Sequence, residues 1–377
     1  LDATSFDIVG ISSFTAKSDV MYAIADHLRA RGTTVVLGGL HCTLVPQEAA
    51  AHADAVVVGE GELVWPALLR DWQRGALQPV YRSPGFRALD LGTVPAPRFD
   101  LLEVERYNRL PIQTSRGCPL DCEFCAASKV FGGYKLAPVE RVVRDIRAAK
   151  AVFPRPFIEL ADDNTFVSKP WSRALVRAIA EEDVHWFTET DVSVADDPAL
   201  MDLLAESGCR QVLIGFESPR RASLEGIEAR DWKARRHDRY RRAIDELQGR
   251  GVTVNGCFIV GLDGDTPDVF EEVERFVRSS SLLEVQVTVL TPFPGTALYR
   301  RLKAEGRLLR ERYWDRCTLF DVNFVPRGMT VEELEQGLEY LMQSLYSPEA
   351  TRGRRRRYAE LARGARKEAG HAQRVAS

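Results

Sequence analysis

The stretch TSRGCPLDCEFCAAS, residues 114–128, decides how the fold of this 377-residue chain is interpreted. It contains three of the seven cysteines, Cys118, Cys122 and Cys125, in the spacing C-x3-C-x2-C. Three neighbouring thiols cannot all pair as disulfides, but three thiolates can bind one compact inorganic cluster. A [4Fe–4S] cube is usually held by cysteine thiolates, and three protein ligands leave one iron open. The spacing therefore predicts a cluster with an open, Lewis-acidic iron.

A three-cysteine zinc site, or three buried thiols, is the alternative interpretation. Zinc motifs favour C-x2-C pairs that are completed by a second pair or by a histidine. No such partner follows here, because His185 and Cys209 are far along the chain in apolar surroundings. The cluster interpretation is therefore favoured.

On this motif, and on the strand-end motifs below, residues 111–310 resemble the radical S-adenosylmethionine (SAM) superfamily. The resemblance implies that the open iron chelates the amino and carboxylate groups of SAM. It also implies reductive cleavage to methionine and a 5′-deoxyadenosyl radical, with an electron donor such as flavodoxin or ferredoxin. Phe124, just before the last cysteine, matches the family's aromatic position beside the adenine.

From residue 111 onward, β-branched segments alternate with segments of helical spacing, which predicts a partial (β/α)6 barrel of the TIM type. Catalytic groups are then expected at the carboxyl ends of the strands, and the cysteine loop follows the first strand. The predicted strands are 112–114, 157–161, 185–190, 212–216, 254–260 and 285–290, and the clearest helices are 139–152, 171–181, 198–207, 235–250 and 267–278.

Polar residues follow the second and third of these strands. Asp162 and Asp163 come after the second strand, where the family places groups that hold the SAM amino group. We expect Asp162 to do so, with Asp163 as second choice; capping of the next helix is the alternative. After the third strand, Glu189, Asp191 and Ser193 alternate outward and suit ribose hydroxyls and methionine polar groups. For each of these three, a solvated strand edge is the competing interpretation.

The last three strands also end in motifs that resemble the family. The fourth ends in G-x-E-S with Glu217, a carboxylate that needs a partner if it is buried near the site. The fifth contains Gly256 and Ile259 in a pattern like G-x-I-x-G, which packs under the adenine in the family. The sixth is followed by a turn that matches P-x-P-G-T. The remaining cysteines, 42, 209, 257 and 317, are expected to be small buried residues.

The N-terminal part alternates strand and helix in the same way, with strands at 6–12, 34–37 and 55–58, and so predicts a parallel, Rossmann-like (flavodoxin-type) sheet. Its glycines lie at strand carboxyl ends, where simple turn chemistry is one explanation. The order ISSFTA, VVLGGLHCTLVPQEA, ADAVVVGEGE resembles the second half of a cobalamin-binding domain. The resemblance implies that Ser12, Ser13, Gly38 and Gly39 line the path of the corrin's nucleotide tail. The first residue is Leu1, so we expect the chain to start inside this domain.

These patterns predict four consecutive regions. They are an incomplete cobalamin-binding-type domain at 1–82, a proline-rich linker at 83–110, the radical SAM core at 111–300 and a helical extension at 301–377. The extension has predicted helices at 299–305 and 331–346 and an arginine run at 354–357. Such a run is usually a solvated helix face, and peripheral contact with acidic lipid or a partner is the alternative.

Composition restricts the class of protein. A net charge of −3 gives no electrostatic case for nucleic acid, and no apolar run approaches the ~20 residues that span a bilayer. An odd, clustered set of cysteines suits a reducing cytoplasm.

The function predicted from these features is abstraction of hydrogen from an unactivated carbon with a [4Fe–4S] cluster and SAM. In the hopanoid and bacteriochlorophyll methylase subgroup that the chain resembles, this leads most often to cobalamin-dependent C-methylation of a lipid, tetrapyrrole or secondary metabolite. Cobalamin-free radical cyclisation or rearrangement, a non-catalytic redox or cobalamin-sensing module, and an inactive paralogue are the alternatives.

Overall fold

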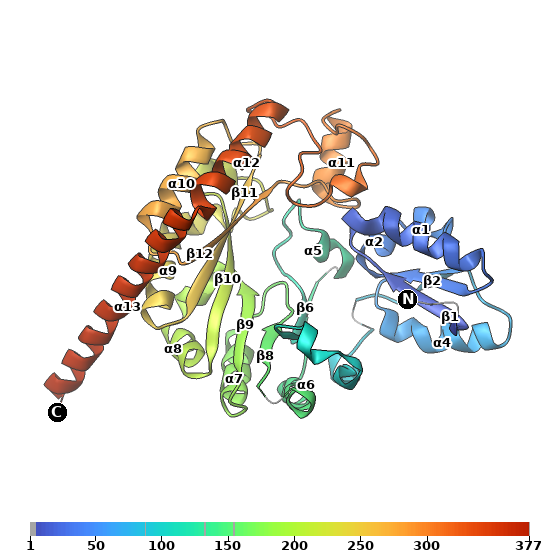
Figure 1. Ribbon diagram of the computed structural model, residues 1–377, viewed down its shortest axis with the longest axis horizontal. Helices are drawn as coiled ribbons and strands as arrows, with labels where there is room; N and C mark the ends of the chain where they lie inside the picture. Colours follow the sequence, from blue (N-terminus) through green and yellow to red (C-terminus); the bar gives the residue numbers. More distant parts are fainter. Residues whose placement is uncertain (1–4, 87, 132, 154, 377) are drawn as a thin grey trace. The chain divides into compact units, whose positions relative to one another are not determined.

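The computed structural model describes residues 5–86, 88–131, 133–153 and 155–376 (Figure 1). The chain divides into two compact units, and neither is continuous in sequence. The first unit comprises Leu1–Val94, Gly117–Tyr134 and Thr291–Val325, and the second comprises Pro95–Arg116, Lys135–Leu290 and Pro326–Ser377. The cysteine loop thus belongs to the same compact unit as the N-terminal sheet.

The first unit is built on a parallel four-stranded sheet in the order β1-β2-β3-β4. Helix α1 (Ser18–Arg29) covers one face and α4 (Gly61–Gln73) covers the other (Figure 1). Alternation along β2 explains this, because Val35 and Leu37 enter one apolar cluster while Val36 enters the other. The strands are β1 Ile8–Ser12, β2 Thr34–Gly38, β3 Ala55–Val58 and β4 Val80–Arg82, and the last of these was not predicted.

Short elements complete the first unit. Helices α2 (Gly39–Leu44) and α3 (Pro46–Ala50) follow β2, and α5 (Ala126–Phe131) follows the cysteine loop. Helix α2 packs against α5. Helix α11 (Ala297–Ala304) begins at Thr296, whose side chain accepts a hydrogen bond from the backbone N–H of Tyr299.

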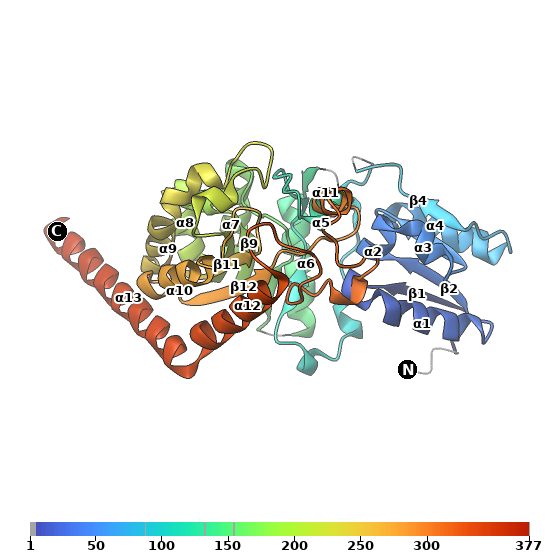
Figure 2. The same ribbon diagram turned by 90° about the horizontal axis from the view of Figure 1, so that it is seen from above.

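The second unit contains six parallel strands in the order β12-β11-β10-β9-β8-β5, with helices on the outer face (Figures 1 and 2). This is the predicted partial barrel. The strands are β5 Leu110–Ile112, β8 Phe157–Leu160, β9 His185–Thr190, β10 Cys209–Glu217, β11 Thr253–Val260 and β12 Glu284–Val289. The outer helices are α6 Val139–Val152, α7 Lys169–Ala180, α8 Pro198–Glu206, α9 Tyr240–Gly249 and α10 Val269–Ser279.

The first strand of the barrel ends earlier than the sequence predicted. Strand β5 stops at Ile112, and residues 113–114 lead into β6 (Ser115–Gly117), which pairs with β7 (Tyr134–Leu136) in a separate two-stranded sheet. The predicted strand at 112–114 therefore overlaps the end of β5 only.

Two helices close the second unit at its C-terminal end. Helix α12 (Val331–Tyr346) begins with a capping box of Thr330 and Glu333 and packs on α10 and β12. Helix α13 (Pro348–Ala376) then runs outward as one long rod (Figure 2). None of the helices in the described part of the chain combines the length and the apolar character that crossing a bilayer requires.

Candidate active site

The cysteine motif forms the turn between β6 and α5. Gly117 has φ +80°, a left-handed conformation that lets the chain leave β6 sharply just before Cys118. The backbone N–H of Cys125 donates to the carbonyl of Cys122 over 3.1 Å, and this bond tightens the second half of the motif. Cys122 is buried, whereas Cys118 and Cys125 are partly exposed.

The donor set of this turn fits an iron–sulfur cluster. Among the described residues no disulfide joins any of the seven cysteines, so Cys118, Cys122 and Cys125 can serve as thiolate ligands. Within the described residues, no three or more His, Cys, Asp and Glu side chains are gathered as for one metal ion. The assignment of the three cysteines as cluster ligands stays a prediction from their chemistry and spacing.

Contacts from α11 anchor the middle of the cysteine motif at Glu123, and we call these contacts the clamp on Glu123. Glu123, between the second and third cysteines, forms a two-pronged ion pair with Arg301 of α11, with N–O distances of 3.0 and 2.6 Å. The backbone N–H of Leu298 also donates to the Glu123 carbonyl over 2.9 Å. Sequence analysis missed Arg301, because it lies 178 positions from its partner.

At the carboxyl edge of the N-terminal sheet, the predicted cobalamin-contacting residues are neighbours. Ser12 pairs in register with Gly38. Gly39 has φ +85°, and a Cβ there would stand 2.1 Å from the Ser12 Oγ, so no side chain fits without a shift. Ser13 is partly exposed and its hydroxyl donates to the Phe14 carbonyl over 3.1 Å. The Ser12 side chain thus fills the space beside Gly39, and the two strand ends pack closely at this edge.

His41, two residues after the glycine pair, is fully buried and already has partners. Its Nε2 lies 3.0 Å from the Tyr22 hydroxyl and its Nδ1 lies 3.3 Å from Thr15 Oγ1. Burial lowers the pKa of His41, which keeps the ring neutral. The ring therefore has a packing role in the described structure.

In the second unit, the two adjacent aspartates after β8 differ sharply. One oxygen of Asp162 accepts the backbone N–H groups of Thr114 (2.8 Å) and Ser115 (2.7 Å), and the other accepts the hydroxyls of Thr114 and Thr165. Asp162 is 5% exposed, and burial raises its pKa. The Asp162 carboxylate thus links the segment after β5 to the segment after β8. Asp163, the second choice for SAM, is exposed.

The carboxylates at the end of β9 also differ from each other. Burial, followed by the charges of Asp163 and Glu159, raises the pKa of Glu189 to about 7. Burial alone would raise the pKa of Asp191 too. Hydrogen bonds from Asn164 Nδ2 (2.8 Å) and from the backbone of Ser193 (2.7 Å) outweigh it, and the pKa of Asp191 is lowered. Asp191 is therefore held as an anion, whereas Glu189 titrates near neutrality.

Glu217, at the end of β10, has the partner that a buried carboxylate requires. The Lys233 Nζ stands 2.7 Å from the Glu217 carboxylate and donates to the Gly215 carbonyl over 2.8 Å. Both side chains are about nine-tenths buried, at 9% and 10% exposure. Glu217 has φ +62°, at a shift in the β10–β11 register. Lys233 was missed, although the need of Glu217 for a cation signalled that one had to exist.

Strand β11 corrects one of the predicted adenine contacts. A Cβ on Gly256 would stand 2.9 Å from Leu282 and 3.1 Å from Phe216, and the next residue on that face, Phe258, meets Phe276 of α10 edge to face. Gly256 therefore faces the helix layer, and its lack of a side chain permits close packing there. Ile259 lies on the opposite, partly exposed face.

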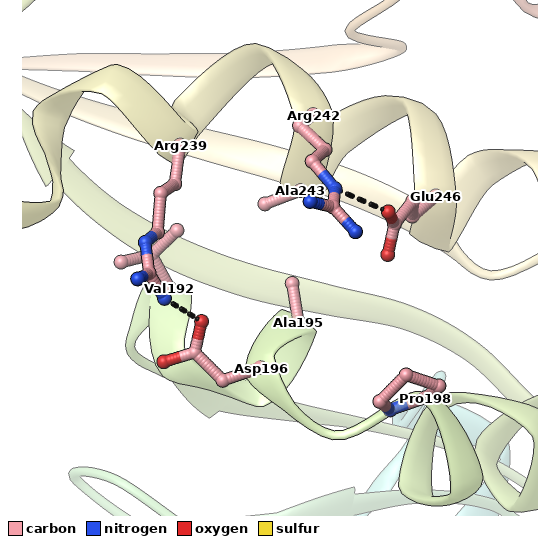
Figure 3. Close-up of a pocket in the computed structure, with 8 residues that line it drawn as sticks. All are labelled: Val192, Ala195, Asp196, Pro198, Arg239, Arg242, Ala243 and Glu246. Carbon is pink, nitrogen blue, oxygen red and sulfur yellow. Dashed lines mark hydrogen bonds and ion pairs between the residues drawn. The ribbon is translucent and has the colours of Figure 1, made fainter.

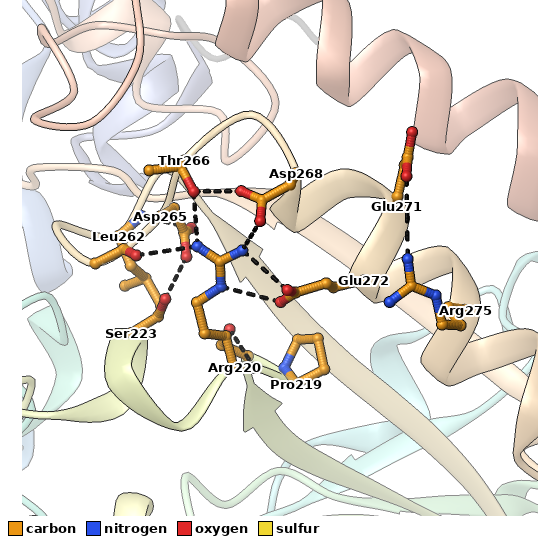
Figure 4. A network of polar contacts seen from close by, with 12 residues as sticks. Pro219, Arg220, Ser223, Leu262, Asp265, Thr266, Asp268, Glu271, Glu272 and Arg275 are labelled. Carbon is orange, nitrogen blue, oxygen red and sulfur yellow. Dashed lines mark hydrogen bonds and ion pairs between the residues drawn. The ribbon is translucent and has the colours of Figure 1, made fainter.

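The loops after β10 and β11 are locked together by a polar network (Figure 4). Arg220 pairs with Glu272 (3.0 Å) and Asp268 (2.6 Å) and donates to Thr266. Asp265 accepts from the Ser223 hydroxyl and from the backbone of Gly261 and Leu262, and burial raises its pKa to about 6. Sequence analysis missed this network because its members come from two separate loops.

Comparison with known families assigns three segments of the chain. Residues 112–277 match the radical SAM superfamily and residues 1–69 match the B12 binding domain. Residues 296–376 match a domain of unknown function, DUF4070.

Individual relatives extend these matches. Bacteriochlorophyllide d C-8(2)-methyltransferase of Chlorobaculum tepidum is 30% identical over 320 residues, which cover 81% of this chain and 70% of that protein. The C-12(1)-methyltransferase of the same organism is 27% identical over 355 residues, which cover 93% and 76%. Among solved structures, the radical SAM methyltransferase TsrM of Kitasatospora setae superposes with a TM-score of 0.68 at 16% identity, over 96% of this chain and 88% of that one. This last likeness concerns the fold alone.

Proposed function

This chain belongs to the radical SAM superfamily and carries a B12-binding domain ahead of its radical SAM domain, and on that premise we propose that it methylates a carbon of a tetrapyrrole. The observation that carries the proposal is the similarity to the C-12(1)-methyltransferase. It covers 93% of the chain and so runs through all three matched segments. The enzyme class is that of a radical SAM C-methyltransferase, and the tetrapyrrole is the proposed substrate.

The cofactors follow from the two domains. A [4Fe–4S] cluster, SAM and cobalamin, when bound, supply a substrate radical and a methyl group to combine with it. The protein has to ligate these groups, orient them and exclude water. The reaction also consumes electrons, for which we propose flavodoxin or ferredoxin as the donor. We also propose a reducing, cytoplasmic location, which an odd and clustered set of seven cysteines suits.

We assign the cluster to Cys118, Cys122 and Cys125, with Phe124 beside the adenine. Support for the cluster ligands comes from the spacing of the three thiols, from the turn that holds them and from the clamp on Glu123.

For SAM itself we assign its ammonium group to Asp163, because the Asp162 carboxylate already accepts the backbone N–H groups of Thr114 and Ser115. Glu189, Asp191 and Ser193 then serve the ribose and the methionine moiety. The buried Glu217–Lys233 pair and Ile259 border the adenosine.

The cobalamin assignment rests on the edge of the N-terminal sheet. Gly38 and Gly39 let the strand ends pack closely on Val57 and Ser12, and Ser12 and Ser13 supply hydroxyls at this edge. A nucleotide tail that enters between strands needs both features.

The test is an anaerobic reaction of the full chain with reconstituted cluster, hydroxocobalamin, a strong reductant, and SAM with a deuterated methyl group. With bacteriochlorophyllide d as substrate, we expect a product that carries the label, together with 5′-deoxyadenosine. The triple Cys118→Ala, Cys122→Ala, Cys125→Ala variant should give neither and should hold no iron. Formation of 5′-deoxyadenosine with an unmethylated but altered product would instead indicate cyclisation or rearrangement.

A further inference from the structure

We propose that a basic cavity between α10, α12 and the start of α13 is a binding site for a phosphate-bearing anion. The cavity has a volume of about 410 Å³. The charged residues that line it are Arg278, Glu349, Arg352, Arg354, Arg356 and Arg357. Nothing in the proposed methyl transfer uses this cavity, so the inference stands independently of that function.

Two of these arginines have structural roles. Arg354 is 5% exposed and donates to the carbonyls of Leu283 (3.0 Å) and Leu345. Arg357 donates to the carbonyls of Ser280 (3.0 Å) and Val277 (3.3 Å). These carbonyls lie at and just beyond the C-terminal ends of α10 and α12, whose partial negative charge would repel an anion if it were uncovered. Arg354 and Arg357 neutralise it.

Two further arginines of this cavity are exposed. Arg352 and Arg356 are four residues apart, so they project from the same side of α13, and both are exposed. Within the described part of the chain, neither has an ion-pair or hydrogen-bond partner, and Glu349 in the same wall pairs with neither of them. Arg278 is already paired with Glu274 over 2.6 Å.

A second pocket on the same unit is lined by charged residues that form ion pairs with one another (Figure 3). It has a volume of about 310 Å³, and its two arginines are both paired, Arg239 with Asp196 and Arg242 with Glu246. The cavity at α13 differs because its cations outnumber its anions and because Arg352 and Arg356 pair with none of the described residues. Burial lowers the pKa of Arg357 most, and the charges of Arg356 and Arg278 lower it further because they are cations close by.

Phosphate is the ligand that this wall suits best. Guanidinium groups are planar forks that bind phosphate oxygens in pairs, and they remain charged at every physiological pH. Two such forks on one helix side, backed by two arginines that cap carbonyls, match a group with two negative charges or a pair of phosphates. A lipid headgroup and a soluble phosphate ester share this chemistry.

The experiment measures binding to the full chain in ~0.15 M salt, where exposed charges more than ~8 Å apart are screened. One arm titrates pyrophosphate by calorimetry. The other measures co-sedimentation with vesicles of phosphatidylglycerol in phosphatidylcholine, against phosphatidylcholine alone. The Arg352→Gln, Arg356→Gln double variant should weaken binding by about tenfold or more, since the charge-assisted bonds to phosphate are lost. Its thermal unfolding should be unchanged.

The matched control is the Arg355→Gln, Arg363→Gln double variant, which removes the same charge from exposed positions of α13 that do not line the cavity. It should retain binding within about twofold, because screened charges away from the site contribute little. Ala350→Glu, which places a carboxylate in the wall, should abolish binding. Vesicle binding alone identifies a lipid-borne phosphate, and pyrophosphate binding alone identifies a soluble one. Equal losses in the two double variants, or no binding in either arm, overturn the proposal.

Discussion

Glu189 and Asp191 stand two positions apart at the end of β9, yet their environments shift the two pKa values in opposite directions. Asp191 accepts two good hydrogen bonds and stays ionised, whereas Glu189 is partly buried near other carboxylates. The SAM site that we propose here thus has one permanent anion and one carboxylate that titrates in the physiological range.

This difference predicts a pH dependence of SAM binding. Because the pKa of Glu189 is about 7, its side chain is mostly neutral at pH 6 and mostly charged at pH 8. The affinity for SAM, measured by equilibrium dialysis without reductant, should rise across this range, and Glu189→Gln should flatten the profile. The raised pKa also means that ionisation opposes folding. Stability contributed by the neutral form should be lost as the pH rises from about 4.5 through about 7. A profile equally steep in the variant would contradict the assignment.

The neighbouring aspartates give a second prediction. Asp162→Ala leaves two buried backbone N–H groups without an acceptor, which costs ~1–3 kcal/mol for each unsatisfied donor. Asp163→Ala changes an exposed side chain, so the free energy of unfolding should stay within ~0.5 kcal/mol of wild type. Chemical denaturation measures both. The affinity for SAM should fall in Asp163→Ala. Normal SAM binding by this variant would instead assign the SAM ammonium group to Asp162 or to Glu189.

The sequence could not separate these two aspartates. Both follow the same strand, and only the course of the chain at residues 113–115 decides which carboxylate meets backbone N–H groups. The cysteine spacing, in contrast, is a local signal that needs no tertiary information to be read.

Among the elements, the strands and helices of the barrel were largely predictable because apolar, β-branched segments recur with regular spacing. Strand β4 was missed, since three residues with one buried side chain carry no period. The prediction for Gly256 shows a related limit of sequence patterns. A strand pattern gives the alternation of faces, but which face meets the helices depends on packing partners such as Leu282.

Helix α11 provides the prediction at this scale. Arg301 holds the cysteine turn through Glu123, so Arg301→Gln should loosen the turn without removing a ligand. We expect less iron per chain after anaerobic reconstitution and faster loss of the cluster absorbance to a chelator. Arg300→Gln is the matched control, because this adjacent arginine bonds the Gly295 carbonyl and not the cysteine turn.

The double exchange Glu123→Arg, Arg301→Glu restores opposite charges and should recover part of the loss. Equal cluster retention in the Arg301 variant and in wild type would show that the ion pair is incidental to the cluster.

At the scale of the whole molecule, the N-terminal sheet offers a test of cobalamin binding that separates displacement of the Ser12 side chain from backbone strain. Gly39 and Gly32 both have left-handed φ values, +85° and +84°, so alanine at either position costs ~1–2 kcal/mol. Only at Gly39 does the new Cβ meet the Ser12 Oγ. Binding of hydroxocobalamin, followed by its visible absorbance, should fall in Gly39→Ala and persist in Gly32→Ala. Retention in both variants would remove the Ser12–Gly39 edge from the cobalamin site.

The discontinuous partition of the chain has a consequence for recombination between relatives. The turn with the three cysteines shares a compact unit with the N-terminal sheet, and α2 of that sheet packs on α5 just after the last cysteine. A chimaera joined by one crossover in the linker would combine the cysteine turn of one parent with the α2 surface of another. Surfaces that contact each other within one compact unit would then come from different parents. A hybrid that exchanges Leu1–Val94, Gly117–Tyr134 and Thr291–Val325 together would inherit that body intact and leave the strands of the barrel free to vary.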